Sequence, residues 1–347
     1  MKRRSFLTTL LGGGAFAQTA PQGPPPPAPL EEPFARSMRR LNPTFYGVPY
    51  VEDLEKLDAD VAFVGIPFDL GTTARPGARY GPSGLRSVAR FGGGAAFDPK
   101  RGWYDYELEE WILRGVRFAD VGDINIMPAD FMPNFDRITE VIGKIVARGA
   151  FPAVLGGDHS ITFPILRAWK GTPQKIRIIH FDSHLDFSDG RQHVRLAHGN
   201  PMRRSFELPW IGGLTSVGIR GITRNTQALE EGRKMGVQVL TAWKVLQMGA
   251  KAAVASIPAA DAYYISFDVD VIDPSLSPAT GTPVPGGFTY YQAKEILAEI
   301  ARKGKVVGFD FVEVAPAYDF AETTQRLTAR LIMDFLGAIF QYNRPGR

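Results

Sequence analysis

The sequence predicts a single α/β domain, a three-layer α/β/α arrangement built around a mainly parallel sheet. Short apolar runs rich in β-branched and aromatic residues alternate with longer segments whose apolar residues recur at helical spacing. The short runs are apolar on both faces, which is typical of parallel strands covered by helices on both sides. No internal repeat and no second linker interrupts the chain after about residue 36, so one domain is the simplest organisation.

Seven of the apolar runs are predicted as strands. They cover residues 60–67, 116–123, 151–157, 176–182, 214–220, 262–270 and 305–314. Between them, residues 135–150 and 289–304 show the helical spacing most clearly. In a parallel sheet of this kind, ligands bind outside the carboxyl ends of the strands, so those ends are where functional residues are expected.

Composition narrows the classes of protein. The 347 residues are 44% hydrophobic and 22% charged, which suits one large globular domain. The formal charge of +4 becomes +1 (4 − 3) if the three basic residues of an N-terminal leader are removed, and no nucleic-acid motif accompanies it. A nucleic-acid partner is therefore not expected. Because the chain has no cysteine, any metal must be held by oxygen and nitrogen ligands.

The N-terminus has the pattern of an export signal. The stretch "RRSFL" resembles a twin-arginine signal, and the "AFA" that follows a short apolar run matches a cleavage site. We therefore expect residues 1–17 to be a signal peptide, 18–35 a proline-rich spacer and 36–347 the catalytic domain. The protein is then expected in the periplasm, with no membrane association after cleavage. A disordered basic N-terminus and an uncleaved anchor are the alternatives.

Four predicted strands end in side chains that bind metals. The segments "AVLGGDHS", "IIHFDSHLDF", "YYISFDVD" and "VVGFDFVEV" each pass from an apolar run to polar residues. Because the carboxyl ends of parallel strands meet at one edge of the sheet, these side chains are expected to converge. They are His159, then Asp182, His184 and Asp186, then Asp268 and Asp270, and finally Glu313.

The spacing favours two ions rather than one. Alternate residues of a strand lie about 6.6 Å apart, which is wide for one small ion. Two ions about 3.5–4 Å apart, bridged by carboxylates, fit such a set better. The four aspartates carry about four negative charges, which two divalent ions would neutralise. Carboxylate and imidazole ligands favour manganese first, with iron, nickel, cobalt and zinc as alternatives.

Several residues next to the predicted ligands are not expected to bind metal. All five histidines fall between residues 159 and 198. His180 is assigned the opposite face from His184 and is expected to point into the sheet packing. Strand alternation likewise predicts that Ser183 points away from the metals. Asp158 is expected to be a turn residue, or to support the ligands from behind, rather than to bind metal itself.

Several blocks of the sequence resemble the ureohydrolase family of arginases and agmatinases. The blocks "GGDHS", "DSHLD", "HGN" and "SFDVDVIDPSLSPATGTPVPGG" match the signatures of the family, and "GIPFDLGTTARPGARYGPSGLR" is similar to its agmatinase branch. The resemblance covers roughly residues 40 to 340 and implies an arginase-like fold, a trimer or hexamer, and a binuclear manganese site. One ion would be held by His159, Asp182, Asp186 and Asp268, and the other by Asp182, His184, Asp268 and Asp270.

The resemblance also implies an activity. Activated water would attack the guanidinium carbon of a guanidino substrate and release urea and an amine, most simply putrescine and urea from agmatine. Glu313 would lie near the guanidinium, and His198 of "HGN" would shuttle a proton to the leaving amine.

Three residues are candidates for binding the rest of the substrate. Asn200 stands where agmatinases usually carry threonine, and the preceding loop lacks the "SGN" element of arginases. Arg191 and Arg195 in that loop would favour a carboxylate tail, as in guanidinobutyrate or guanidinopropionate, if they faced the pocket. Hydrolysis of a formimidoyl compound or of free guanidine, and a catalytically silent metal-binding protein of the same fold, are further alternatives.

Overall fold

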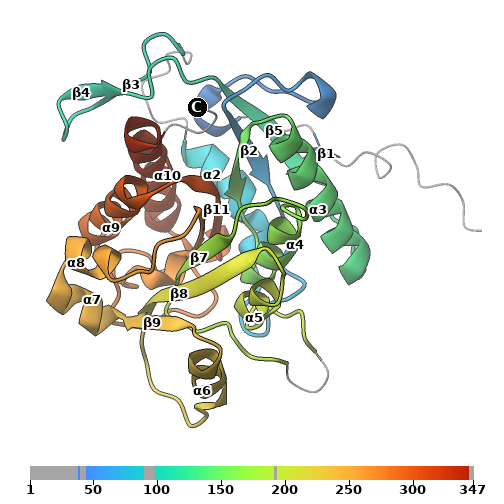
Figure 1. Cartoon of the computed structure of the whole chain (residues 1–347). Coiled ribbons are helices and arrows are strands. Elements are labelled where there is room, and N and C mark those ends of the chain that lie inside the picture. The colour runs from blue at the N-terminus through green and yellow to red at the C-terminus, as the bar shows by residue number, and fades with distance from the viewer. Residues whose placement is uncertain (1–37, 40–43, 90–97, 191–193, 344–347) are drawn as a thin grey trace, which may run out of the picture. The chain divides into compact units, whose positions relative to one another are not determined.

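A nine-stranded sheet forms the centre of the structure, a computed structural model that describes residues 38–39, 44–89, 98–190 and 194–343. These residues all belong to the unit Arg36–Arg347, whereas the predicted signal peptide and spacer lie outside the described residues. The strand order is β1-β5-β2-β6-β11-β10-β7-β8-β9 (Figure 1). The strands are β1 (Met38–Arg39), β2 (Val61–Gly65), β5 (Phe118–Ile124), β6 (Phe151–Leu155), β7 (Ile176–Phe181), β8 (Ile211–Ile219), β9 (Gln238–Thr241), β10 (Ala262–Asp268) and β11 (Val306–Val312).

The sheet is parallel except at one edge. The pairings among β5, β2, β6, β11, β10, β7, β8 and β9 are all parallel, and β1 pairs with β5 in the antiparallel sense. Each parallel connection requires a crossover, and the helices supply it. The prediction of a mainly parallel sheet is confirmed. A separate hairpin of β3 (Trp103–Asp105) and β4 (Glu110–Ile112) was not predicted.

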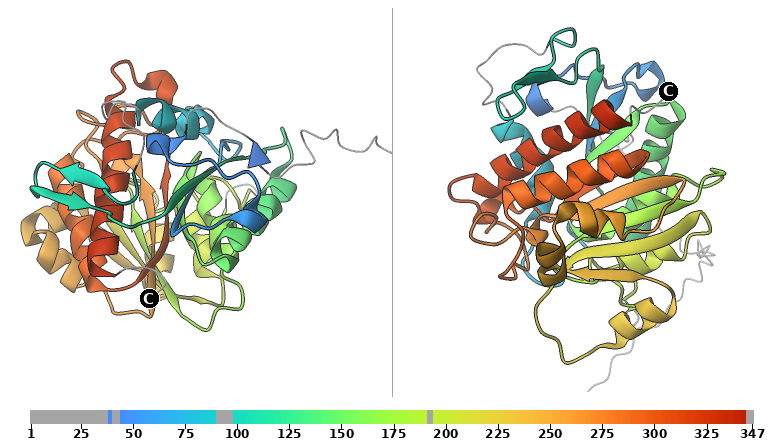
Figure 2. Two further views of the ribbon diagram at one scale, coloured as in Figure 1. Left: turned by 90° about the horizontal axis from the view of Figure 1, so that it is seen from above. Right: turned by 60° about the vertical axis from the view of Figure 1, so that its left-hand side comes forward.

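Helices cover both faces of the sheet. Figure 2, seen from above, places α9 and α10 on one side of the strands and α3 on the other. This three-layer order confirms the predicted fold class. The helices are α2 (Gly81–Val88), α3 (Phe131–Ala147), α4 (Thr162–Arg167), α5 (Pro201–Phe206), α6 (Gln227–Lys234), α7 (Ala242–Met248), α8 (Ala250–Ala255), α9 (Tyr290–Lys303) and α10 (Thr323–Tyr342), with short 3-10 turns that include η4 (His159–Ile161) and η5 (Val269–Val271).

Each strand contributes side chains to two cores. Phe63 and Phe311 pack in the core beneath α8, α9 and α10, whereas Val64 and Val312 pack in the core beneath α3 and α4. Strand side chains alternate between faces, so a strand covered on both sides must be apolar at nearly every position. All five residues of Val61–Gly65 are buried, which accounts for the unbroken apolar run in the sequence.

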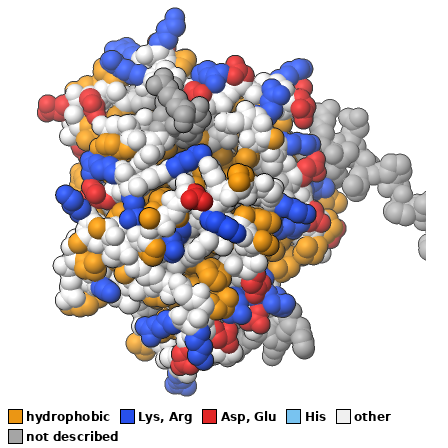
Figure 3. All heavy atoms as spheres, viewed as in Figure 1, with side chains coloured by type: hydrophobic (Ala, Val, Ile, Leu, Met, Phe, Trp, Pro, Cys, Tyr) orange, Lys and Arg blue, Asp and Glu red, His pale blue; other side chains and the backbone are white. Residues whose placement is uncertain are grey.

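The predicted strands are all present, but six of the seven end one or two residues before the predicted C-terminal limit. The run predicted over 262–270 is a strand only to Asp268, and the run predicted over 176–182 ends at Phe181. The acidic residues beyond these points therefore lie in turns and not on a strand ladder. No described helix is long and apolar enough to cross a membrane. On the face shown in Figure 3, basic side chains are spread among acidic and hydrophobic ones rather than gathered in a stripe.

Candidate metal centre

The predicted ligands meet at the carboxyl ends of four neighbouring strands. In the sheet these strands stand in the order β6, β11, β10, β7, and all their pairings are parallel. His159 follows β6 in η4, Glu313 follows β11, Asp268 ends β10, and Asp182 follows β7. Their convergence is the position that an open parallel sheet offers for ligand binding.

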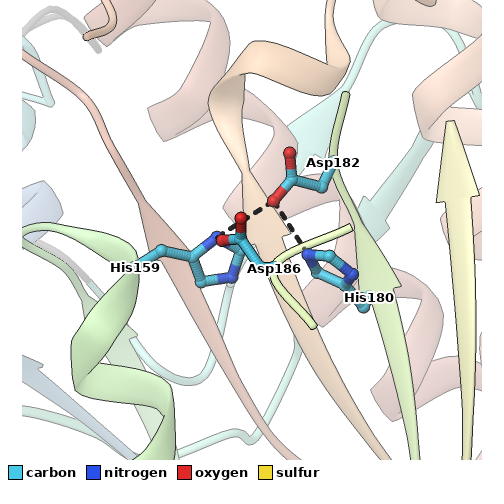
Figure 4. Close-up of side chains that lie close together, drawn as sticks. All are labelled: His159, His180, Asp182 and Asp186. Carbon is cyan, nitrogen blue, oxygen red and sulfur yellow. Dashed lines mark hydrogen bonds and ion pairs between the residues drawn. The ribbon is translucent and has the colours of Figure 1, made fainter. Parts of the chain in front are cut away.

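One half of the site is centred on His159. Its Nδ1 lies 3.1 Å from Oδ2 of Asp182, 3.1 Å from Oδ2 of Asp186 and 3.3 Å from Oδ2 of Asp268. Figure 4 shows Asp182 and Asp186 turned toward this ring. Within the described part of the chain, Nδ1 is fully buried and makes no hydrogen bond of acceptable geometry. A buried nitrogen facing three carboxylate oxygens without a hydrogen bond is the arrangement that a metal ion would complete.

The other half is centred on His184. Its Nδ1 lies 3.0 Å from Oδ2 of Asp270 and 3.4 Å from Oδ1 of Asp182. The two oxygens of Asp182 therefore face the two histidines separately, Oδ2 toward His159 and Oδ1 toward His184. This is the placement expected of a bridging carboxylate. All six predicted ligands are thus brought together, from three segments of the chain.

Local turns, and not strand alternation, bring the acids close. Oδ1 of Asp268 accepts a hydrogen bond from the amide of Asp270 at 2.8 Å and caps η5. Oδ1 of Asp182 accepts from the amide of His184 at 2.5 Å in the same way. Asp186 has a φ of 47°, in the left-handed region, so the chain turns sharply there. The predicted ladder spacing of about 6.6 Å does not apply to these residues, because β7 has already ended.

The electrostatics favour a bound cation. Burial raises the pKa of Asp268 well above its usual range, and the charges of Asp270 and Asp182 add to this effect. Burial and Asp182 likewise raise the pKa of Asp270 to about 6. Carboxylates in such a cluster destabilise one another, and divalent cations would remove that cost. The donor set of four carboxylates and two imidazoles therefore fits a site for two divalent ions.

A second pair of polar side chains adjoins the cluster. Nδ1 of His198 lies 3.0 Å from Oε1 of Glu313, and the same oxygen accepts a hydrogen bond from the amide of His159 at 2.9 Å. Nε2 of His198 accepts a hydrogen bond from the amide of Thr73 at 3.1 Å and lies 2.8 Å from Oγ1 of the same residue. Burial opposes protonation of His198, but the hydrogen bond and charge of Glu313 raise its pKa to about 9. Thr73, in the loop after β2, was not singled out from the sequence.

The three predicted substrate-binding residues have other partners or are not described. Asn200 is buried, with Oδ1 accepting from the amide of Ala197 and Nδ2 donating to the carbonyl of Ser188. Nη2 of Arg195 forms an ion pair with Asp189 at 2.7 Å, and its side chain is 55% exposed. Arg191 lies outside the described residues. Their role in substrate binding stays a prediction, and no described contact of Asn200 or Arg195 supports it.

Two expectations based on strand alternation were wrong. His180 does pack inside the sheet, but its Nε2 lies 2.8 Å from Oδ2 of Asp182, so it faces the metal cluster (Figure 4). Residues 180 and 184 are four positions apart, so the alternation of side chains along a strand would place both on the same face of the sheet. Oγ of Ser183 lies 3.0 Å from Nδ1 of His184 because the chain has left the strand. Asp158, by contrast, caps η4 as the expected turn residue.

The sequence pattern that defines the Arginase family matches residues 59–337 of the chain. The chain belongs to the arginase family. It is 34% identical to the mitochondrial guanidino acid hydrolase of Homo sapiens over 93% of this chain and 88% of that protein. It is 37% identical to the mitochondrial agmatinase of Gallus gallus over 83% of each chain. It is 33% identical to the guanidinobutyrase of Pseudomonas aeruginosa over 84% of this chain and 91% of that one.

Solved structures agree with this membership of the arginase family. A hypothetical agmatinase from Burkholderia thailandensis superposes with a TM-score of 0.74 at 32% identity, covering 86% of this chain and 90% of that chain. Proclavaminate amidino hydrolase from Streptomyces clavuligerus gives a TM-score of 0.73 at 31% identity, covering 89% and 99%. The predicted arginase-like fold and the family resemblance are both confirmed.

Proposed function

We propose that the chain is a binuclear metallohydrolase that cleaves a guanidino C–N bond to give urea and an amine, with agmatine as its first substrate. The observation that carries the proposal is the unpartnered Nδ1 of His159. It is buried among carboxylates in a cluster that directly adjoins the pair formed by His198 and Glu313. Membership of the arginase family supports the same chemistry.

Manganese is the proposed metal. The six side chains offer only oxygen and nitrogen donors of hard to borderline character, which suits manganese better than a thiophilic ion. His159, Asp182, Asp186 and Asp268 would hold one ion, and Asp182, His184, Asp268 and Asp270 the other. When bound, the pair of ions supplies Lewis-acid activation of a water molecule.

The remaining chemistry falls to Glu313 and His198. The Glu313 carboxylate is buried and can accept hydrogen bonds from the substrate guanidinium, which fixes the reacting carbon over the cluster. His198 is held at both ring nitrogens, by Glu313 at Nδ1 and by Thr73 at Nε2. The Glu313 carboxylate raises the pKa of His198 to about 9, which favours a proton on the ring at neutral pH. Nε2 accepts from the amide of Thr73 in this structure, so it would leave that contact when it gives a proton to the leaving amine nitrogen.

Agmatine and the guanidino acids share the guanidino group and differ at the other end of the molecule, which is an ammonium group in agmatine and a carboxylate in the acids. Arg195 would favour a carboxylate tail only if its charge faced the pocket. Its ion pair with Asp189, which Asp189 also forms with Arg204, reduces that charge within the loop and weakens the case for a carboxylate tail. Guanidinobutyrate is the second candidate, because relatives of nearly equal similarity are named as guanidino acid hydrolase and guanidinobutyrase.

Urea release tests both candidates. Manganese-reconstituted protein without residues 1–17 would be assayed with agmatine and with guanidinobutyrate, and the amine product would be identified in each case. Urea and putrescine from agmatine, lost in the Asp268→Asn variant, are the expected result. Urea from guanidinobutyrate alone would keep the reaction and change the substrate. Formamide from a formimidoyl substrate, or binding of metal without turnover of any guanidino compound, would refute the proposal.

Export and assembly are proposed on sequence grounds alone. We propose that the twin-arginine pattern directs the protein to the periplasm and that the mature protein is a trimer or hexamer. Fractionation of cells, with sequencing of the mature N-terminus, tests the first proposal, and finding the full-length chain only in the cytoplasm would refute it. Light scattering of the purified protein tests the second, and a monomer would refute it.

A further inference from the structure

The hairpin of β3 and β4 presents an aromatic face to solvent. Tyr104 and Trp111 are cross-strand partners whose ring centroids lie 5.6 Å apart, and the ring of Tyr106 packs edge-on against Tyr104 at 5.3 Å. Tyr106 is 85% exposed, and Leu108 in the turn is 51% exposed. Adjoining exposed aromatic side chains are typical of surfaces that bind another protein.

The charge of this hairpin is entirely acidic. Residues 103–112 contain four acidic residues and no basic residue. Two of the acids, Asp105 and Glu107, fasten the hairpin to α10 and α9 by ion pairs. The other two, Glu109 and Glu110, are exposed, and among the described residues their side chains have no ion pair or hydrogen bond. We define the hairpin surface as Tyr104, Tyr106, Leu108, Glu109, Glu110 and Trp111.

A second exposed apolar group lies on α7. Trp243 is 71% exposed and Leu246 is 40% exposed, and two residues three positions apart share one side of a helix. Residues 232–260 contain four basic residues and no acidic residue. Lys244 of α7 and Lys251 of α8 are exposed, and neither ammonium group has an ion pair within the described part of the chain. We define the α7 surface as Trp243, Lys244, Leu246 and Lys251.

The two surfaces lie apart on one molecule and carry opposite charge. In Figure 1 the hairpin lies at the upper left and α7 at the lower left, with α9 and α8 between them, so the two surfaces do not cover each other. Contact between two copies of the same surface would bring like charges together, which costs free energy. Contact between the hairpin surface and the α7 surface of another copy brings opposite charges together. Charge complementarity therefore favours the unlike pair.

We propose that the hairpin surface of one copy of the chain docks on the α7 surface of a second copy. The inference rests on the assembly proposed above and names the two surfaces that form it. Tyr106 and Trp243 would be buried in this interface, where tyrosine and tryptophan contribute most of the binding free energy. The two free glutamates of the hairpin would face the two lysines of the α7 surface. Because the two surfaces differ, each copy can contact two neighbours, which allows a closed ring of copies.

Charge reversal tests the pairing, because a second reversal can restore it. One variant carries Glu109→Lys and Glu110→Lys, a second carries Lys244→Glu and Lys251→Glu, and a third carries all four substitutions. The mass of each protein in solution is measured by light scattering after size-exclusion chromatography, over a range of protein concentrations. Thermal unfolding of the same preparations checks the fold, which should be kept because all four residues are exposed.

A matched control carries Glu55→Lys and Lys170→Glu, two exposed residues outside both surfaces. We expect the wild type and this control to have the same oligomeric mass. Each two-residue variant should dissociate at a protein concentration at least about tenfold higher than the wild type, and the four-residue variant should recover the wild-type mass. Equal masses in all variants, an equal loss in the control, or no recovery in a folded four-residue variant would overturn the inference while the assembly stands. A monomeric wild type would instead overturn the proposed assembly.

Discussion

Substitution of Glu313 by glutamine separates binding of the guanidinium from the architecture of the site. Oε1 of Glu313 accepts hydrogen bonds from the amide of His159 and from Nδ1 of His198. An amide oxygen in the same position can still accept both. Oε2 of Glu313 lies beside Gly281. Among the described residues, none donates a hydrogen bond to Oε2. The change therefore removes a charge and leaves the internal contacts available.

The expected loss follows from the lost charge. With its oxygen held by His159 and His198, glutamine places an NH2 group at the position of Oε2, and this group cannot accept from the guanidinium, so a hydrogen bond to a charged group of about 1.5–3 kcal/mol is lost. If Glu313 binds the substrate guanidinium, Glu313→Gln should lower kcat/KM by about 10- to 150-fold, taking about 1.4 kcal/mol per tenfold change. The manganese content should stay close to that of the wild type, while the thermal midpoint of unfolding at neutral pH should fall because the charged pair with His198 is lost.

Steady-state urea release from agmatine is the assay, with thermal unfolding and metal analysis on the same preparations. A kcat/KM within about twofold of the wild type, with full metal content, would refute the assignment of Glu313 to the guanidinium. A fall in kcat/KM accompanied by loss of metal would show instead that Glu313 acts through the amide of His159 and not on the substrate.

Four further outcomes are expected. Thr73→Val removes the hydroxyl that lies 2.8 Å from Nε2 of His198 and should lower kcat/KM about 2- to 12-fold without changing stability, as checked by kinetics and thermal unfolding. The pKa of His198 is raised from 6.5 to about 9 by Glu313, so the stabilisation from this pair is complete below about pH 6.5 and is lost as the pH rises through about 9. The difference in unfolding free energy between wild type and Glu313→Gln, measured in urea without metal, should shrink over that window. Manganese at about 100 times its Kd should stabilise the folded protein by about 2.7 kcal/mol, and chelation should reverse the gain in Tm. Arg86→Met breaks a buried network with Asp120 and Asp123 and should lower the free energy of unfolding by about 3–5 kcal/mol, measured in urea.

The sequence located the metal centre because strand ends are easy to recognise. Polar residues that follow an apolar run at four places could be assigned to one edge of a parallel sheet without knowing any distance. Asp268 and Asp270 were found in this way, and they lie where the argument placed them. The same argument fails one residue after a strand stops, because alternation of side chains depends on extended backbone. Ser183 was misplaced for that reason.

Contacts between segments that are distant in the sequence could not be predicted from the sequence alone. Thr73 contacts His198 across 125 positions, and nothing in either segment indicates the other. The ion pair of Arg195 with Asp189 depends on how one loop folds back on itself, which composition does not specify.

The position of the metal ligands at the strand ends also explains why sequence identity to known relatives does not determine the substrate. The chain is 37% identical to a protein named agmatinase and 34% identical to one named guanidino acid hydrolase, so overall identity does not separate the two kinds of substrate. The shared part is the guanidino end, where the metal ligands and Glu313 are fixed at the rigid ends of β6, β7, β10 and β11. We expect the tail of a bound substrate to extend away from these strand ends, toward the surrounding loops. A carboxylate tail requires an unopposed cation there. Asp189 pairs with both Arg195 and Arg204, so the described part of this loop opposes an ammonium tail less than its arginine content suggests, which is consistent with the proposal of agmatine.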